Sequence, residues 1–193
     1  MRPTLIIFAK EPRPGRVKTR LARDIGATTA AWWYRHQTAR LLRAVGRDPR
    51  WRTVLAVSPD QAASPSRIWP EGIARAPQGG GDLGARMARA LQAVPDGPVA
   101  VIGSDIPGVR PGHIARAFRL LGQHDAVIGP AEDGGYWLVG LRRGSLPVPG
   151  LFRGVRWSGP HAMADTIASM GSLRVGFADE LADVDRAEDL ARK

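Results

Sequence analysis

The residues of this chain with the clearest chemical potential are a cluster of cations near its start. An apolar run, Thr4 to Ala9, leads into a Pro- and Gly-rich turn that carries five cations: Lys10, Arg13, Arg16, Lys18 and Arg20. Unpaired like charges this close repel by roughly 1 kcal/mol in water and by about 4 kcal/mol at an effective dielectric of about 20. An ordered cluster therefore favours an anion in its middle, and a phosphate chain is the obvious candidate. The alternative interpretation is a solvated basic loop.

This cationic loop matches neither a Walker P-loop nor the Gly-x-Gly-x-x-Gly turn of dinucleotide-binding folds, because Gly15 is its only glycine. Phosphate binding would rest mainly on side chains, with Gly15 in the turn that presents them. Lys10, Lys18 and Arg20 are predicted to bind the phosphates, whereas the two arginines between the lysines are expected to point outward. The planar fork of arginine suits diphosphate oxygens, and lysine acts as a point charge.

Three consecutive glycines, Gly79 to Gly81, form a second candidate binding segment, placed before a helical pattern with Asp82 as its N-cap. A flexible turn and a cap explain Asp82 and one glycine. They do not explain three glycines, which let a backbone approach a flat ligand closely. Gln78 is expected to read a base edge, Gly81 to contact the nucleotide, and Arg86 to reach a phosphate or to pair with an acid.

Three carboxylates predict a metal site. Asp105 follows an apolar strand and precedes Pro107, while Asp183 and Asp185 alternate in an extended segment, so that their side chains point to one side. Three carboxylates around a diphosphate are the oxygen-rich environment that Mg²⁺ or Mn²⁺ prefers. The alternatives are a turn role for Asp105 and an N-cap role for Asp185, with Glu188 as its capping-box partner.

Gly134 and Gly135 permit the backbone to approach closely whatever lies at the edge of the sheet. Glu132 and Asp133 are the acids nearest to them. They are predicted to orient or deprotonate an acceptor. A polar hairpin turn is the alternative, because Asp-Gly is a common turn signal. Trp157 to Gly159 and His161 form a last polar and aromatic cluster, in which a lone histidine at a helix start is more often structural than catalytic.

Alternating strands and helices must position these residues. Apolar runs predict strands at Thr4 to Ala9, Thr53 to Ser58, Val99 to Gly103, Ala126 to Gly129 and Tyr136 to Leu141. Helical patterns cover Thr28 to Val45, Leu83 to Val94, Pro111 to Leu121 and Pro160 to Met170, and a last helix begins near Asp185 to Glu188. The alternation predicts an α/β fold whose mostly parallel central sheet is flanked by helices on both faces. Ligands of such sheets bind beyond the carboxyl ends of the strands, where the candidate residues fall.

The composition agrees with a single domain over residues 1–193. A chain of 193 residues buries roughly 70% of its unfolded surface. With 44% hydrophobic and 24% charged residues it is not of a disordered type, and with no cysteine it has neither disulfides nor thiolate metal sites. The apolar run at its start is too short for a signal peptide or a membrane span, so we expect a cytoplasmic protein.

The net charge of +10 raises the question of a nucleic-acid partner. The arginines are, however, spread along the whole chain rather than gathered in one tail, which argues against nucleic acid as the main partner. A phosphate-bearing small molecule needs less charge and better geometry. We therefore expect a nucleotide or nucleotide-sugar substrate.

Taken together and in this order, the segments resemble a bacterial family of GT-A-type glycosyltransferases in the nucleotide-diphospho-sugar transferase superfamily, some of whose relatives are associated with arsenosugar biosynthesis. The matching residues are Phe8 to Leu21, Gln78 to Met87, Gly103 to Pro107, Gly129 to Leu141, Phe152 to Ser158 and Asp183 to Leu190. The resemblance implies a single GT-A-like (Rossmann-like) domain, a nucleotide over the loop of the first strand, and a metal held at Asp105. Ala9 and Ser104 are accordingly also predicted to contact the nucleotide.

The chain departs from the family pattern at two places. The family's D-x-D pair is here Ser104-Asp105-Ile106, so a second acidic ligand must come from elsewhere, with Asp183 or Asp185 as the natural candidates. Gly159 stands where family members tend to carry Thr, which suggests a different acceptor if that hydroxyl touches it.

The leading functional hypothesis is a metal-dependent glycosyltransferase that uses a nucleoside-diphosphate sugar, with Mg²⁺ or Mn²⁺ as its cofactor. The alternative is a nucleotidyltransferase that joins a nucleoside triphosphate to a phosphorylated acceptor and releases pyrophosphate. A noncatalytic protein that binds polyanions through its diffuse charge is the third hypothesis. The sequence names neither sugar, base, acceptor nor oligomeric state.

Overall fold

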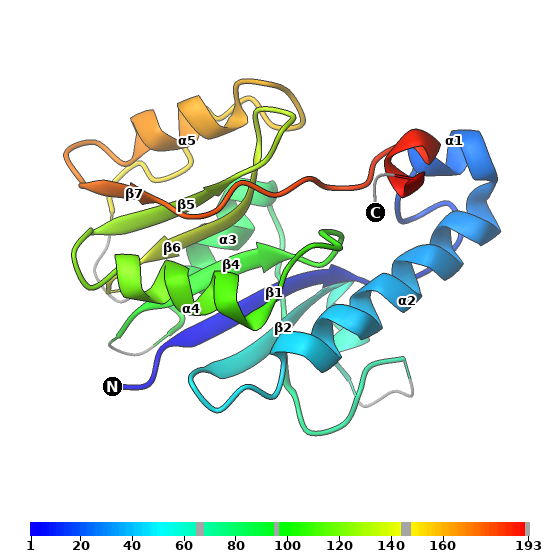
Figure 1. Cartoon of the computed structure of the whole chain (residues 1–193), viewed down its shortest axis with the longest axis horizontal. Helices are drawn as coiled ribbons and strands as arrows, with labels where there is room; N and C mark the ends of the chain where they lie inside the picture. Colours follow the sequence, from blue (N-terminus) through cyan, green and yellow to red (C-terminus); the bar gives the residue numbers. More distant parts are fainter. Residues whose placement is uncertain (65–67, 95–96, 144–147, 192–193) are drawn as a thin grey trace.

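The protein is built on one seven-stranded sheet, seen here in a computed structural model that describes residues 1–64, 68–94, 97–143 and 148–191 (Figure 1). The order of the strands is β3-β2-β1-β4-β6-β5-β7, and β6 runs antiparallel to both of its neighbours. The other pairings are parallel. The strands are β1 (Thr4–Lys10), β2 (Arg52–Ser58), β3 (Ala74–Pro77), β4 (Val99–Gly103), β5 (Ala126–Pro130), β6 (Tyr136–Leu141) and β7 (Val175–Phe177).

Helices cover both faces of this sheet because its strands are apolar on both sides. Leu5 and Ile7 of β1 pack in one core cluster with residues of α2 and α4, and Ile6 packs in another with residues of α3 and α5. This alternation follows from the two-residue period of a strand. The helices are α1 (Leu21–Ile25), α2 (Ala27–Val45), α3 (Leu83–Gln92), α4 (Pro111–Leu120) and α5 (Ala162–Ser169), with 3-10 turns η1 (Asp60–Ala63) and η2 (Ala187–Ala191).

The predicted fold class is confirmed. All five predicted strands are present, and α2 to α5 occupy the predicted helical segments. Strands β3 and β7 were not predicted, because each is short and lies at an edge of the sheet, where apolar patterning is weak. Helix α1 has only five residues and was also not predicted.

The residues expected at the ends of helices are confirmed for α3 and α4 but not for the segment after Asp185. Asp82 caps α3 by accepting a hydrogen bond from the amide of Ala85, as predicted, and Pro111 is the first residue of α4. The alternative role considered for Asp185, an N-cap with Glu188 as its capping-box partner, is wrong in its partner, because Asp189 is the accepting side chain. The amides of Asp185 and Arg186 both donate to the carboxylate of Asp189, which leaves the Asp185 carboxylate for other partners.

The topology gathers distant segments at one edge of the sheet. Strands β1 and β4 are parallel neighbours, with Phe8 opposite Gly103, so the loops that follow them start side by side. After β7 the chain forms a bridge from Leu181 to Ala131 and then crosses to α1, as Figure 1 shows for the red segment. In the part of the chain that the structure describes, no helix is long and apolar enough to cross a membrane.

Candidate active site

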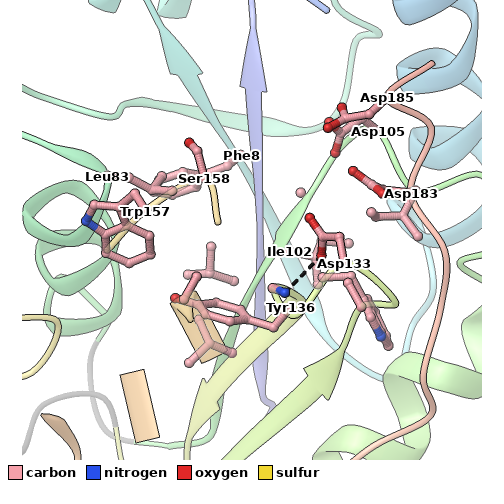
Figure 2. A pocket seen from close by; sticks show the side chains of 18 of the residues that line it. Phe8, Leu83, Ile102, Asp105, Asp133, Tyr136, Trp157, Ser158, Asp183 and Asp185 are labelled. Atoms are coloured by element: carbon pink, nitrogen blue, oxygen red, sulfur yellow. Dashed lines mark hydrogen bonds between the residues drawn. The ribbon is translucent and has the colours of Figure 1, made fainter. Parts of the chain in front are cut away.

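A pocket of about 520 Å³ lies at the carboxyl ends of β1 and β4. Its volume is in the range of sites that enclose a small-molecule ligand. The pocket is lined by these predicted site residues: Lys10, Lys18, Arg20, Asp105, Asp133, Asp183 and Asp185. Figure 2 shows the four aspartates on one side of it. They come from three separate parts of the chain, which the fold brings together.

Lys18 lies at the centre of this charged side. Its Nζ is 2.7 Å from Oδ2 of Asp105 and 2.9 Å from Oδ1 of Asp185, and its side chain is only 5% exposed. Burial lowers the pKa of Lys18, but the charges and hydrogen bonds of the two aspartates outweigh it and hold that pKa above its ordinary value. Its backbone φ of 45° lies in the left-handed region, which costs a residue with a side chain about 1 kcal/mol or more. A strained, buried cation is thus fixed between two acids.

Arg20 extends this network across the pocket. One of its guanidinium nitrogens lies 2.8 Å from Oδ2 of Asp185, and the other donates to the carbonyl of Ser158 at 3.4 Å. Burial raises the pKa of Asp185, but Lys18 and Arg20 together hold it below its usual value. Ser158 has a φ of 63°, so a second strained residue lies at the same pocket. The loop after β1 is therefore tied to the C-terminal segment and to the loop before α5.

Asp183 has a different environment. It lines the pocket beside Asp185, while Val184 between them is buried, as the alternation of an extended segment predicts. Burial and then the charge of Asp185 raise the pKa of Asp183 to about 6, although Lys18 opposes them. Its carboxyl group thus holds a proton more firmly than an ordinary aspartate does.

The donor set for a metal is chemically suitable, because carboxylate oxygens are ligands that Mg²⁺ and Mn²⁺ prefer. Within the described residues, however, no three acidic or histidine side chains are arranged to hold a metal ion. The reason is visible in the contacts of Lys18, whose ammonium group stands between Asp105 and Asp185. In this conformation the lysine provides the positive charge that a cation would provide. Metal binding by Asp105, Asp183 and Asp185 stays a prediction.

The two predicted catalytic acids differ in position. Asp133 lines the pocket, and its Oδ1 accepts a hydrogen bond from the amide of Gly135 at 2.9 Å. Glu132 is exposed and does not line it. The two acids lie in the connection of the antiparallel β5–β6 hairpin, so the turn interpretation is correct and is compatible with a role for Asp133.

Two predicted nucleotide contacts are used by the fold itself. Gln78 is buried, and its Nε2 donates to the carbonyls of Ala9 and Ala56, which fastens the end of β3 to β1 and β2. Ser104 is buried and lies 2.7 Å from the hydroxyl of Tyr34. Neither lines the pocket. A base edge would have to compete with two hydrogen bonds of the Gln78 amide, and nucleotide binding by either residue stays a prediction.

The other predicted nucleotide contacts also lie outside the pocket lining. Ala9 is buried within β1, and Gly15 forms an exposed turn with a φ of 75°. Arg86 donates from its Nε to the carbonyl of Gly81 at 2.9 Å, so these two residues contact each other. Their roles toward a nucleotide likewise stay predictions.

The structure adds residues that the sequence analysis did not single out. The hydroxyl of Tyr34, on α2, accepts a hydrogen bond from the amide of Lys10 at 2.9 Å and also contacts Ser104. It therefore joins the ends of β1 and β4. Leu83 lines the pocket and is 45% exposed. The sequence feature that could have identified Leu83 is its apolar side chain directly after the capping Asp82.

Comparison with known proteins gives two results for the sequence. Residues 41–159 match the family described as "Uncharacterized protein conserved in bacteria (DUF2064)". No curated protein matches the chain.

Solved structures show further similarity. A candidate nucleotide-diphospho-sugar transferase from Desulfovibrio desulfuricans G20 is 34% identical to this chain, with a TM-score of 0.84 over 96% of this chain and 83% of that one. Two more distant structures share the fold. Rv0371c of Mycobacterium tuberculosis H37Rv, in complex with manganese, is 19% identical with a TM-score of 0.54, over 100% of this chain and 97% of that one. The 4-diphosphocytidyl-2C-methyl-D-erythritol synthase of Anaerococcus prevotii is 11% identical with a TM-score of 0.61, over 97% and 92%.

Proposed function

The chain belongs to the DUF2064 family of bacterial proteins, and we propose that it is a metal-dependent glycosyltransferase that takes its sugar from a nucleoside-diphosphate sugar. The observation that carries the proposal is the network of Lys18, Arg20, Asp105 and Asp185 at the ends of β1 and β4. The similarity to the candidate nucleotide-diphospho-sugar transferase of Desulfovibrio desulfuricans supports the same class of substrate.

The cations of the pocket bind the diphosphate of the donor. Lys10, the last residue of β1, and Arg20, in the segment that follows β1, both line the pocket. Lys18 joins them when a phosphate oxygen competes for its ammonium group, because the charge on a diphosphate is larger than that on one carboxylate. Asp105 and Asp185 would then be the ligands of a divalent cation, which would offset the negative charge of the departing nucleoside diphosphate.

Asp133 is the proposed general base. Its carboxylate lines the pocket on the same side as the other three aspartates and is oriented by the amide of Gly135. It takes the proton of an acceptor hydroxyl while the acceptor oxygen bonds to the anomeric carbon. The bond from that carbon to the diphosphate breaks, and the nucleoside diphosphate leaves with the electron pair.

Phosphorus NMR tests this proposal directly. The purified protein is incubated with Mg²⁺ or Mn²⁺, pooled nucleotide sugars and simple acceptors, and we expect release of nucleoside diphosphate. Asp105→Asn should abolish this release and weaken Mn²⁺ binding, measured by electron paramagnetic resonance. Asp179→Asn is the matched control, because Asp179 is paired with Arg116 and lies outside the pocket lining. Equal activity and equal Mn²⁺ binding in wild type and Asp105→Asn would refute the proposed roles.

Nucleotidyl transfer is the second candidate, and the observation in its favour is the convergence of three cations, Lys10, Lys18 and Arg20, on one pocket. This much positive charge also suits a triphosphate. The same NMR experiment with pooled nucleoside triphosphates and phosphorylated acceptors separates the two reactions. Formation of pyrophosphate would show that the reaction is nucleotidyl transfer and not glycosyl transfer.

A further inference from the structure

The pocket has a second side that is apolar and faces the acidic one. It is formed by Phe8, Leu83, Met87, Tyr136 and Trp157, which we name the apolar wall. Figure 2 shows Phe8, Leu83 and Trp157 on the side away from the aspartates, with Tyr136 below them. The wall comes from four elements or loops that are separate in the sequence, so the fold assembles it in the same way as the charged side.

Trp157 is held rigidly in this wall. A Cβ added to Gly84 would lie 2.9 Å from Cζ2 of Trp157 and 2.7 Å from Cβ of Phe152, so both side chains pack directly on the first turn of α3. The rings of Phe152 and Trp157 are also in contact, with centroids 6.1 Å apart. A large aromatic ring is thus fixed at the pocket by close packing on a glycine.

Leu83 and Tyr136, two other members of the wall, offer apolar surface to the pocket. Leu83 is 45% exposed although it lies next to the buried Gly84. The hydroxyl of Tyr136 accepts a hydrogen bond from Oγ1 of Thr166, which is fully buried. The polar end of the tyrosine is therefore occupied within the protein, and its ring lines the pocket.

We propose that the apolar wall binds a planar apolar ring of the acceptor substrate, so that the acceptor is an aromatic alcohol or a similar ring-bearing hydroxyl compound rather than a polyol. This inference rests on the proposed glycosyl transfer. Tyr136 follows Asp133 closely on the β5–β6 hairpin, so the wall shares this hairpin with the proposed base.

The apolar wall favours a planar ring over a polyol because the two ligands differ in what they lose when they leave water. A polyol against this wall would lose hydrogen bonds to water and find few partners in the wall. A planar ring would instead cover the exposed surface of Leu83 and stack on the aromatic side chains. Aromatic stacking of this kind changes affinity by about fivefold to tenfold for one ring.

Ligand-observed NMR tests the ring site without requiring turnover. The probes are 2-phenylethanol, 2-cyclohexylethanol of similar size without a planar ring, and glycerol. We expect 2-phenylethanol to bind best. Its dissociation constant should rise about fivefold to tenfold in Trp157→Ala, which removes a stacking ring, and should also rise in Leu83→Ser, which removes apolar surface. Trp32→Ala is the matched control, because Trp32 is 62% exposed on α2 and does not line the pocket. Leu83→Ser is decisive if Trp157→Ala does not fold.

Three results would overturn the inference: equal binding of the three probes, unchanged binding in Leu83→Ser, or displacement of 2-phenylethanol by nucleoside monophosphates, which would make the wall a nucleobase site. The release of nucleoside diphosphate is measured separately, with 2-phenylethanol or glycerol as the acceptor. A preference for the aromatic alcohol that disappears in Leu83→Ser supports the inference. Ring binding without any release would refute glycosyl transfer while leaving the ring-binding site itself in place.

Discussion

Lys18 joins two carboxylates from distant parts of the chain through one buried ammonium group. Its contacts with Asp105 and Asp185 connect residues that are 87 (105 − 18) and 167 (185 − 18) positions away in the sequence. Removing the ammonium group would leave two acids close together without their common cation, which is unfavourable in a partly buried site. The same group is the proposed ligand of the donor phosphates.

We therefore expect Lys18→Met to lower the rate of donor turnover by about a hundredfold or more, as the loss of a positioned charge in an active site does. Arg16→Met is the control, because Arg16 is exposed in the same loop and lies outside the pocket lining. Steady-state rates of nucleoside diphosphate release measure both. A Lys18→Met protein that is folded by circular dichroism and as active as Arg16→Met would contradict the assignment.

Asp183 gives the stability of the protein an unusual dependence on pH. Its folded-state pKa is raised from 3.8 to about 6, so between these values the folded state binds a proton that the unfolded state does not. The contribution of Asp183 to the free energy of unfolding is therefore full below pH 3.8 and falls as the pH rises through about 6. Aspartates with lowered pKa values, such as Asp125, have the opposite sign and lose their contribution as the pH falls.

Urea denaturation of wild type and Asp183→Asn at a series of pH values, with chelator present, isolates this contribution. We expect the variant to gain stability relative to wild type as the pH rises from about 4 to about 6, and the difference to become constant above that. A difference that does not change with pH in this window would show that Asp183 has an ordinary pKa.

At the level of secondary-structure elements, the contact between α3 and the loop before α5 determines the shape of the pocket. Gly84 permits this contact, since a side chain there would meet Phe152 and Trp157 at less than 3.0 Å. The glycine is buried, and its helix begins at the edge of the pocket. The spacing of α3 from Trp157 thus depends on the absence of one methyl group.

Gly84→Ala should lower the free energy of unfolding by about 1 to 3 kcal/mol, because it overpacks this contact. Gly112→Ala is the matched control on α4, where an added Cβ meets nothing within 4 Å and alanine favours the helix. Chemical denaturation of both variants measures the change. Equal stability of the two would mean that α3 and the loop can separate freely.

At the level of the whole molecule, the net charge of +10 predicts an interaction that is independent of the pocket. Diffuse positive charge binds polyanions by releasing counterions, and this binding weakens steeply with salt. Binding of a donor in the pocket depends instead on particular groups such as Lys18 and Asp105.

We expect labelled DNA to bind weakly at about 50 mM salt, to lose most of that affinity at about 200 mM, and to be unaffected by Asp105→Asn. Donor binding should respond less to salt and should be lost in Asp105→Asn. Fluorescence anisotropy and calorimetry measure the two. DNA binding that persists at high salt, together with no binding of any nucleotide sugar, would favour the polyanion-binding hypothesis.

The sequence by itself determined the order of elements and the placement of several acids. Long apolar strands and amphipathic helices have periods that can be read locally, so the α/β alternation and the position of Asp105 after β4 followed from the chain alone. The same local rule placed Asp183 and Asp185 on one side of an extended segment.

The tertiary structure alone decided which partners these residues have. Nothing local distinguishes Gln78, whose amide joins three strands, from a glutamine that faces a ligand. The position of Lys18 between Asp105 and Asp185, and the apolar wall opposite them, depend on contacts across the whole chain. Such contacts are set by the packing of strands and loops in three dimensions, because sequence periodicity specifies which face a residue occupies but not what it meets there.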